Sequence, residues 1–234
     1  MSQALPKISI AIDGFSSTGK STVAKRLAKT LGYIYIDTGA MYRAVTYYAL
    51  QNKLISSNHF DKKELIAQLK NIQLEFRFKP DLGFAAMYLN GKNIEKEIRS
   101  MQVSKFVSPV AAVPEVRRFL VKIQREMGRN KGVVMDGRDI GSVVLPDAEL
   151  KIFLTADPKI RAERRLLEMK EKGVQVDFES IYNNVLERDH IDSTRTDSPL
   201  IKVPDAVEID ASNIDKEEQF QQILSLAHKA ILNK

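Results

Sequence analysis

At 234 residues, 44% hydrophobic and 28% charged, the chain suits one α/β domain with an elaboration or two small domains, and either can bury a core. It has no cysteine, which excludes disulfides and thiolate metal sites, and its three histidines are too far apart to favour a histidine-rich metal site. The formal net charge of +6 favours an anionic partner, either nucleic acid or small phosphates.

The sequence has no run of about 18 uncharged apolar residues, the length that a membrane-spanning helix requires. Lys7 and Asp13 also come too early for a signal peptide. We therefore expect a cytoplasmic protein that does not act at a membrane.

Residues 8–31 predict a buried strand, a loop and a helix. Ile8, Ile10 and Ile12 alternate with smaller residues up to Asp13, as in a short buried strand. Gly32 is suited to a left-handed helix end. Apolar residues at helical spacing precede it: Val23, Ala24, Leu27, Ala28 and Leu31.

The loop between this strand and this helix has the pattern Gly-x-x-x-x-Gly-Lys-Ser of a phosphate-binding P-loop. Its residues are Gly14, Phe15, Ser16, Ser17, Thr18, Gly19, Lys20, Ser21 and Thr22. Glycines let backbone N–H groups turn inward, and the helix N-terminus adds partial positive charge. Lys20 would reach the β- and γ-phosphates of a nucleotide, and the Ser21 hydroxyl would bind Mg²⁺. The alternative is a glycine-rich turn that caps an ordinary helix.

Residues 33–36 predict a second short strand, and Asp37 or Thr38 can cap a helix that continues to about residue 50. Tyr42 and Arg43 lie in the first turns of that helix. Polar residues at the carboxyl end of a strand line the crevice where open α/β sheets bind ligands. A capped helix with a solvated Arg43 remains the alternative.

Residues 61–70 predict a surface helix, after which the pattern changes to that of strands. Residues 72–78 alternate, and residues 85–89 form a second strand that turns at Asn90-Gly91, a favoured hairpin dipeptide. We expect residues 71–97 to form a small inserted antiparallel sheet outside the parallel core.

Residues 99–128 predict helical structure interrupted at Pro109 and Pro114. Ser108 and Arg117 flank these prolines. On pattern alone, a loop serine and a solvated arginine are the better interpretation of this pair.

Residues 132–136 predict a buried strand that ends in Asp136, a pattern that helps to hold Mg²⁺ through water in P-loop enzymes. The polar turn at residues 137–141 follows, with Arg138 and Asp139 again at the carboxyl end of a strand. An Arg-Asp pair at a sheet crevice favours a bound ligand over a merely solvated turn.

Residues 150–154 predict the next strand, and Asp157-Pro158 begins a helix that Gly173 stops after Lys172. Arg161, Arg164 and Arg165 share one face of this helix. A helix from about residue 178 presents Arg188, Asp192 and Arg195 at intervals of four and three. Two arginine faces suit closure over a polyanion. For the helix that carries Arg161, nearby glutamates leave a salt-bridged surface helix as the alternative. Residues 207–209 and 220–231 predict a last strand and an amphipathic helix.

Taken together, five features resemble the bacterial cytidylate kinases, which are P-loop nucleoside monophosphate kinases, and the resemblance covers nearly the whole chain. They are the P-loop, the stretch Asp-Thr-Gly-Ala-Met-Tyr-Arg at 37–43, Asp-Gly-Arg-Asp-Ile-Gly at 136–141, the arginines that follow Asp157, and Arg-Asp-His-Ile-Asp-Ser-Thr-Arg at 188–195. Phe15 departs from the resemblance, because the family often has proline there. The resemblance implies a single three-layer α/β domain over residues 1–234, with a central parallel sheet, a monophosphate-binding region with its antiparallel insert at about 38–109, and a helical lid at about 157–195.

The resemblance also implies transfer of the γ-phosphoryl group of ATP to CMP or dCMP, with Mg²⁺, by a monomer that binds no nucleic acid. Lys20 and the lid arginines Arg161, Arg164 and Arg165 would be catalytic. Ser21 would bind Mg²⁺ directly and Asp136 through water. The remaining implied roles are binding of the acceptor phosphate by Thr38, Tyr42, Arg43 and Arg138, of cytosine by Ser108, Arg117 and Asp139, and of ribose by Arg188 and Asp192 with Arg195 nearby.

Two alternatives to a cytidylate kinase remain at this point. One is a P-loop kinase for another small acceptor. The other is a nucleotide-dependent switch or a nucleic-acid-binding protein, although the sequence lacks the guanine-reading Asn-Lys-x-Asp motif and the aromatic-basic interleaving of single-strand binders.

Overall fold

The computed structural model describes residues 6–79, 84–171 and 173–234. The chain divides into two compact units, which are described separately. The first unit comprises residues 1–36 and 127–234, and the second comprises residues 37–126.

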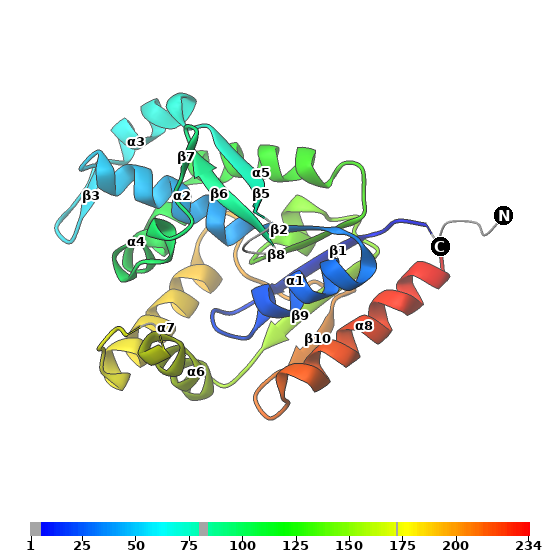
Figure 1. The fold of residues 1–234 in the computed structure, drawn as a ribbon. Coiled ribbons are helices and arrows are strands. Elements are labelled where there is room, and N and C mark those ends of the chain that lie inside the picture. The colour runs from blue at the N-terminus through cyan, green and yellow to red at the C-terminus, as the bar shows by residue number, and fades with distance from the viewer. Residues whose placement is uncertain (1–5, 80–83, 172) are drawn as a thin grey trace. The chain divides into compact units, whose positions relative to one another are not determined.

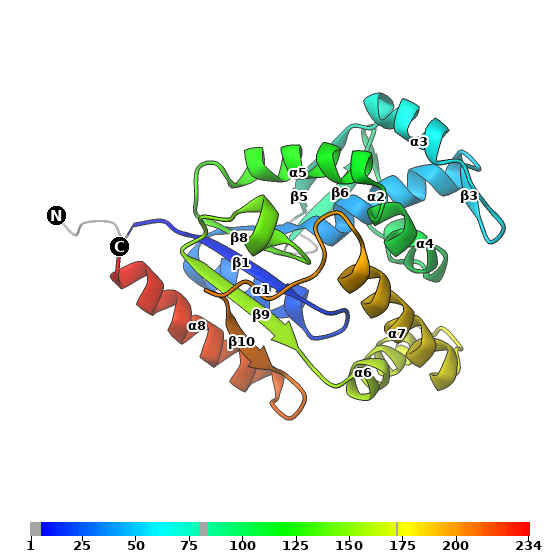
Figure 2. The same ribbon diagram turned by 180° about the vertical axis from the view of Figure 1, so that it is seen from behind.

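The first unit is built on a five-stranded parallel sheet with the order β10-β9-β1-β8-β2 (Figures 1 and 2). The first strand, β1, pairs with β8 on one side and β9 on the other. The strand bounds are β1 Ser9–Gly14, β2 Ile34–Asp37, β8 Val133–Gly137, β9 Leu150–Thr155 and β10 Val207–Asp210. This arrangement confirms the predicted α/β class with a parallel central sheet, and it places the carboxyl ends of β1 and β8 side by side.

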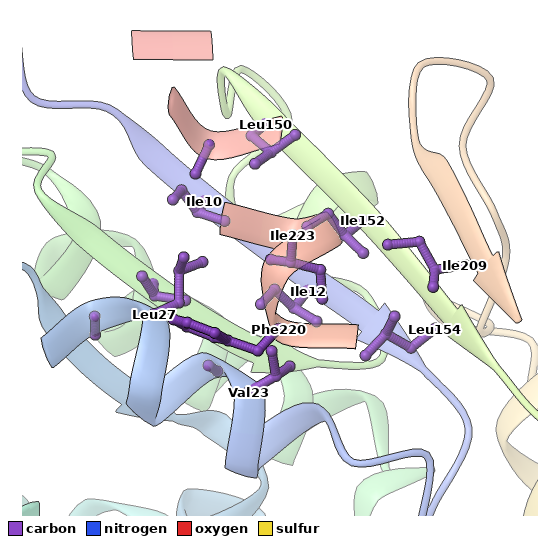
Figure 3. Packing of buried hydrophobic residues seen from close by; sticks show 14 of the residues in the cluster. Ile10, Ile12, Val23, Leu27, Leu150, Ile152, Leu154, Ile209, Phe220 and Ile223 are labelled. Carbon is purple, nitrogen blue, oxygen red and sulfur yellow. The ribbon is translucent and has the colours of Figure 1, made fainter. Parts of the chain in front are cut away.

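Helices α1 (Lys20–Leu31) and α8 (Lys216–Leu232) pack on the sheet, and their apolar faces form its core. Figure 3 shows Leu27 of α1 and Phe220 of α8 in one apolar cluster with Ile12 of β1 and Ile152 of β9. Gly32 ends α1 at a φ of 65°, the left-handed conformation expected from the sequence. Because α1 is fixed on the sheet by this core, its N-terminus is fixed too.

Helices α6 (Pro158–Glu171) and α7 (Phe178–Thr194) pack against each other in the first unit. Asp157 accepts from the backbone N–H groups of Lys159 and Ile160, which confirms the predicted helix start. Lys172, where we expected the helix to end, lies outside the described residues. The stretch expected as a polar turn continues as a short π-helix, η3 (Ile140–Val144).

The second unit combines helices with two small antiparallel sheets. Its helices are α2 Thr38–Gln51, α3 Lys62–Gln68, η1 Leu69–Asn71, η2 Glu97–Arg99, α4 Met101–Ala111 and α5 Pro114–Gly128, the last of which continues into the first unit. Its strands are β3 Ile55–Ser56, β4 His59–Phe60, β5 Leu74–Lys79, β6 Phe84–Leu89 and β7 Lys92–Asn93.

The sheet β5-β6-β7 confirms the predicted antiparallel insert. Asn90 and Gly91 join β6 to β7 with φ values of 49° and 80°, as a two-residue hairpin turn requires. The β3-β4 hairpin was not predicted, because strands of two residues are too short to show alternation.

The predicted interruption at Pro109 is wrong, because Pro109 lies inside α4. Proline removes one backbone donor, but the helix continues past it, because the N–H of Ala112 donates to the carbonyl oxygen of Ser108 at 3.0 Å. Helix α5 begins with Pro114 at its first position, where a missing N–H has no cost. Across the part of the chain that the structure describes, no helix is both long and apolar enough to span a membrane.

Candidate active site

Residues 14–22, the predicted phosphate loop, have at two positions a backbone conformation that only glycine allows. Gly14 has a φ of 143°, and a Cβ there would lie 1.9 Å from the carbonyl oxygen of Leu154. Gly19 has a φ of 89° and immediately precedes α1. The loop therefore closes tightly over the end of β1 and presents the N-terminus of α1, whose first N–H groups have no partner within the helix.

Lys20 lies within this loop and is only 5% exposed. Its ammonium donates to the carbonyl oxygen of Phe15 and, at 3.3 Å, to Thr18 Oγ1. Burial and the nearby Arg138 lower the pKa of Lys20, against the opposing carboxylate of Asp136. The buried hydroxyl of Ser16 has no hydrogen-bond partner among the described residues. A buried cation and an orphaned donor suit a phosphate group.

Asp136, at the end of β8, is buried and faces the first turn of α1. Ser21 Oγ donates to its Oδ2 at 2.7 Å, and the Tyr35 hydroxyl donates to its Oδ1 at 2.8 Å. Hydroxyl and carboxylate oxygens are the hard ligands that Mg²⁺ prefers, so Ser21 and Asp136 fit this ion. The described residues contain no cluster of three or more His, Cys, Asp or Glu side chains able to hold a metal.

Arg138 and the end of α7 form a charged cluster. Arg138 Nε donates to Asp192 Oδ2 at 2.9 Å, and Arg195 lies 3.6 Å from the same carboxylate. Burial opposes ionisation of Asp192, but Arg138, Arg188 and Arg195 hold its pKa below the usual value. Burial and Arg138 lower the pKa of Arg188 to about 10. The structure thus brings Arg138 to the three residues that helical spacing had already linked, Arg188, Asp192 and Arg195.

Asp139 is 2% exposed and precedes η3, whose first turn is held by Asp13 of β1. The carboxylate of Asp13 accepts from the N–H groups of Ile140 at 2.8 Å and Gly141 at 2.7 Å. Burial raises the pKa of Asp13 to about 7, although these two hydrogen bonds act in the opposite direction. Asp13 therefore fixes the backbone that carries Arg138 and Asp139.

The three arginines of α6 lie on one side of the helix, but they bind different groups. Arg161 is buried and pairs with Asp189 of α7. Arg164 donates to the carbonyl oxygen of Ala211, after β10, at 2.6 Å. Burial lowers the pKa of Arg165, and Glu168 opposes that shift. Helical spacing predicted the shared side correctly, whereas the long side chains reach separate partners.

The second unit holds the other expected site residues. Thr38, Tyr42 and Arg43 lie on α2, Ser108 on the adjacent α4, and Arg117 on α5. Arg117 is 1% exposed, donates to the carbonyl oxygen of Ala111 at 3.2 Å and lies 5.4 Å from the centre of the Tyr42 ring. The interpretation of Arg117 as a solvated arginine is therefore wrong. Arg43 donates to the carbonyl oxygen of Ile98 at 3.5 Å.

Sequence reasoning missed four residues that support the site, because each acts on a distant part of the chain. Tyr35 orients Asp136, Asp189 holds Arg161, and Gln219 of α8 donates to the carbonyl oxygen of Thr18 at 3.1 Å. Arg99 donates to Asp37 at 2.8 Å, while Asp37 caps α2 through the N–H of Ala40. A polar residue at an otherwise core-facing position, such as Gln219 beside Phe220, is the one signal that could have indicated such a contact.

The chain is similar to known proteins over nearly its whole length. The family model described as cytidylate kinase matches residues 10–229. The chain is 60% identical to the cytidylate kinase of Flavobacterium johnsoniae, over 97% of this chain and 99% of that one. It is 58% identical to the cytidylate kinase of Flavobacterium psychrophilum, over 96% and 99%, and 53% identical to that of Parabacteroides distasonis, over 97% and 99%. The chain therefore belongs to the cytidylate kinase family.

Proposed function

We propose that the protein transfers the γ-phosphoryl group of ATP to CMP or dCMP, giving ADP and CDP or dCDP. The observation that carries the proposal is the phosphate loop with a buried Lys20 and neighbouring buried arginines, in a chain that belongs to the cytidylate kinase family. A buried cation at the N-terminus of a helix is stable in the presence of an anion, which a polyphosphate supplies.

The donor nucleotide would bind through the phosphate loop, residues 14–22. Backbone N–H groups at the start of α1 would hold the β- and γ-phosphates, and Lys20 would add its charge. Ser21 and Asp136 would hold Mg²⁺, which when bound neutralises charge on the phosphate oxygens. The hydrogen bonds of Ser21 and Tyr35 to Asp136 support this role, because they fix both oxygens of the carboxylate.

The residues proposed for the acceptor nucleotide are those that the resemblance to the family implies. Cytosine has an exocyclic amino donor where uracil has a carbonyl acceptor, so a carboxylate facing that edge accepts from one base and repels the other. Asp139 would have this role, with Ser108 and Arg117. The acceptor phosphate would be held by Thr38, Tyr42, Arg43 and Arg138, and the ribose by Arg188, Asp192 and Arg195.

The chemistry needs no general base, because the acceptor phosphate is already an anion and a nucleophile. What the protein would supply is alignment, exclusion of water and positive charge around the oxygens of the transferred group. Arg161, Arg164 and Arg165 would contribute that charge from α6. Asp192 supports a fixed Arg138 for this purpose, because an ion pair limits the rotamers of the guanidinium.

A panel of monophosphates tests the proposal. The purified protein is given ATP, Mg²⁺ and one of CMP, dCMP, UMP, AMP or GMP, and release of ADP is measured in a coupled assay. We expect the highest kcat/KM with CMP or dCMP. A preference for AMP or GMP would overturn the assignment, and salt-sensitive RNA binding without any phosphoryl transfer would favour a nucleic-acid-binding protein instead.

A further inference from the structure

The guanidinium of Arg161 joins three segments of the first unit. Its Nε donates to the carbonyl oxygen of Ala156, at the end of β9, at 2.8 Å. One terminal nitrogen donates to Asp189 Oδ1 at 3.0 Å and to the carbonyl oxygen of Ser16 at 3.4 Å. The other donates to Asp189 Oδ2 at 2.5 Å. Arg161 is 2% exposed, so these contacts replace water almost completely.

One ring from the phosphate loop completes this arrangement. The guanidinium carbon of Arg161 lies 5.1 Å from the centre of the Phe15 ring, within the range of a cation–π contact. Phe15 in turn meets Phe153 of β9 edge to face, with ring centres 6.0 Å apart. The aromatic residue at position 15 therefore connects the arginine of α6 with the sheet.

The hydrogen bonds of Arg161 occupy most of its donors. A guanidinium has five N–H groups, and four of those of Arg161 have an acceptor in the structure. The remaining one, on the nitrogen that binds Asp189 Oδ2, has no acceptor among the residues that the structure describes. These contacts hold the side chain beside the phosphate loop in one orientation.

We propose that Asp189 is a positioning residue for phosphoryl transfer, because its two oxygens hold Arg161 against the phosphate loop. This inference rests on the proposed function, since the reaction is its readout. Preorganised charge stabilises a transition state without reorganisation during the reaction, whereas a guanidinium that must first be ordered contributes less. A bidentate Arg–carboxylate pair fixes the orientation of a guanidinium as well as adding energy, because its two parallel hydrogen bonds match the planar fork of the arginine.

The first variant is Asp189→Asn, which keeps the size of the side chain and one acceptor but loses the charge and the second acceptor. We expect kcat with CMP to fall about tenfold, less than the ~10²–10³ lost when a preorganised donor is removed outright, because Arg161 remains and asparagine still offers it one acceptor. The KM for CMP is expected to stay within about twofold, because transition-state interactions affect kcat. Asp189→Glu, which restores the carboxylate, is expected to recover part of the rate. The matched control is Glu187→Gln, an exposed carboxylate on the same helix, which should leave both constants unchanged.

A double-mutant cycle with Arg161→Met decides whether Asp189 acts through Arg161. If it does, Asp189→Asn has no further effect on kcat once Arg161 is methionine. The charge of Asp189 also acts on Arg188, so an undiminished effect in the Arg161→Met background would mean that Arg188 carries it and would overturn the proposal. Thermal melting of each variant checks that folding is intact.

The outcomes separate this inference from the proposed function. An enzyme that phosphorylates CMP but is unaffected by Asp189→Asn overturns the role of Asp189 alone. A wild-type protein that phosphorylates no monophosphate overturns the proposed function and this inference together. A tenfold loss that Asp189→Glu partly reverses, and that disappears in the Arg161→Met background, supports both.

Discussion

The hydroxyl of Tyr35 donates to Asp136 Oδ1 at 2.8 Å, so the phenol of one parallel strand fixes the carboxylate at the end of its neighbour. Ser21 Oγ occupies the other oxygen at 2.7 Å. Residues that orient a metal-binding carboxylate commonly matter nearly as much as the carboxylate itself. Tyr35 therefore belongs to the proposed Mg²⁺ site, although it would not contact the ion.

The variant Tyr35→Phe is expected to raise the Mg²⁺ concentration needed for half-maximal rate about tenfold, the lower end of the loss for such supporting residues. The measurement is the rate at fixed ATP against total Mg²⁺. Tyr33→Phe is the matched control, because the Tyr33 hydroxyl accepts from the N–H of Ile8 at 3.1 Å instead of donating to Asp136. An unchanged Mg²⁺ requirement in Tyr35→Phe would show that Asp136 is oriented without it.

Lys20→Met is expected to reduce kcat at least about a hundredfold, the loss typical of one preorganised charge or donor. Methionine keeps most of the side-chain volume, and among the described residues the wild-type ammonium bonds only within its own loop, so the fold should survive. The rate with CMP and a thermal melt check the two parts of this prediction. Lys29→Met, at the exposed end of the same helix, should retain full activity. An active Lys20→Met enzyme would remove the phosphate-binding role of the loop.

The elements of the fold could be predicted from the sequence because their signals are local. The strand before the loop, the left-handed Gly32 and the hairpin at Asn90-Gly91 each depend on a few adjacent residues. The contacts that shape the site are not local, since Tyr35 and Asp136 are 101 residues apart. Periodicity indicates which face of a strand is buried, but it does not indicate which strand lies next to it.

Helical spacing likewise does not predict which groups the arginines of α6 contact. It correctly places Arg161, Arg164 and Arg165 on one side of the helix, but a guanidinium reaches several ångströms beyond its Cβ. The partners of Arg161 and Arg164 are Asp189 and the carbonyl oxygen of Ala211, and neither follows from the spacing. The resemblance implied a lid role for all three arginines together, whereas the structure gives each its own surroundings.

Asp139→Asn is expected to reduce discrimination between CMP and UMP. The buried Asp139 carboxylate would accept from the cytosine amino group and repel the uracil carbonyl, and an amide can serve either base. The ratio of kcat/KM for CMP to that for UMP should fall about tenfold, within the ~1–3 kcal/mol that one base-reading pair supplies. Asp147→Asn, an exposed residue that follows η3, is the control. Unchanged selectivity in Asp139→Asn would contradict the base-reading role.

Asp37 carries two contacts that depend on its charge. Its Oδ1 accepts from the N–H of Ala40 at 2.8 Å and caps α2, and its Oδ2 accepts from Arg99 at 2.8 Å. Burial opposes ionisation of Asp37, but Arg99 and the N–H of Ala40 hold its pKa below the ordinary value of 3.8. Arg99 also pairs with Glu95 at 2.8 Å, so one guanidinium connects the start of α2 with the segment before η2.

Replacing Arg99 with glutamine is expected to lower the free energy of unfolding by about 1 kcal/mol at pH 7, a value discounted for the partial exposure of the arginine. A carboxyl with a lowered pKa in the folded protein stabilises the fold above its ordinary pKa, and this contribution is lost as the pH falls through the lower value. The difference between wild type and Arg99→Gln should therefore be constant well above the ordinary pKa of 3.8 and be lost as the pH falls through the lowered pKa of Asp37. Urea unfolding at several pH values measures it. Arg118→Gln, which breaks a surface pair with Glu115, should cost less than ~0.5 kcal/mol throughout.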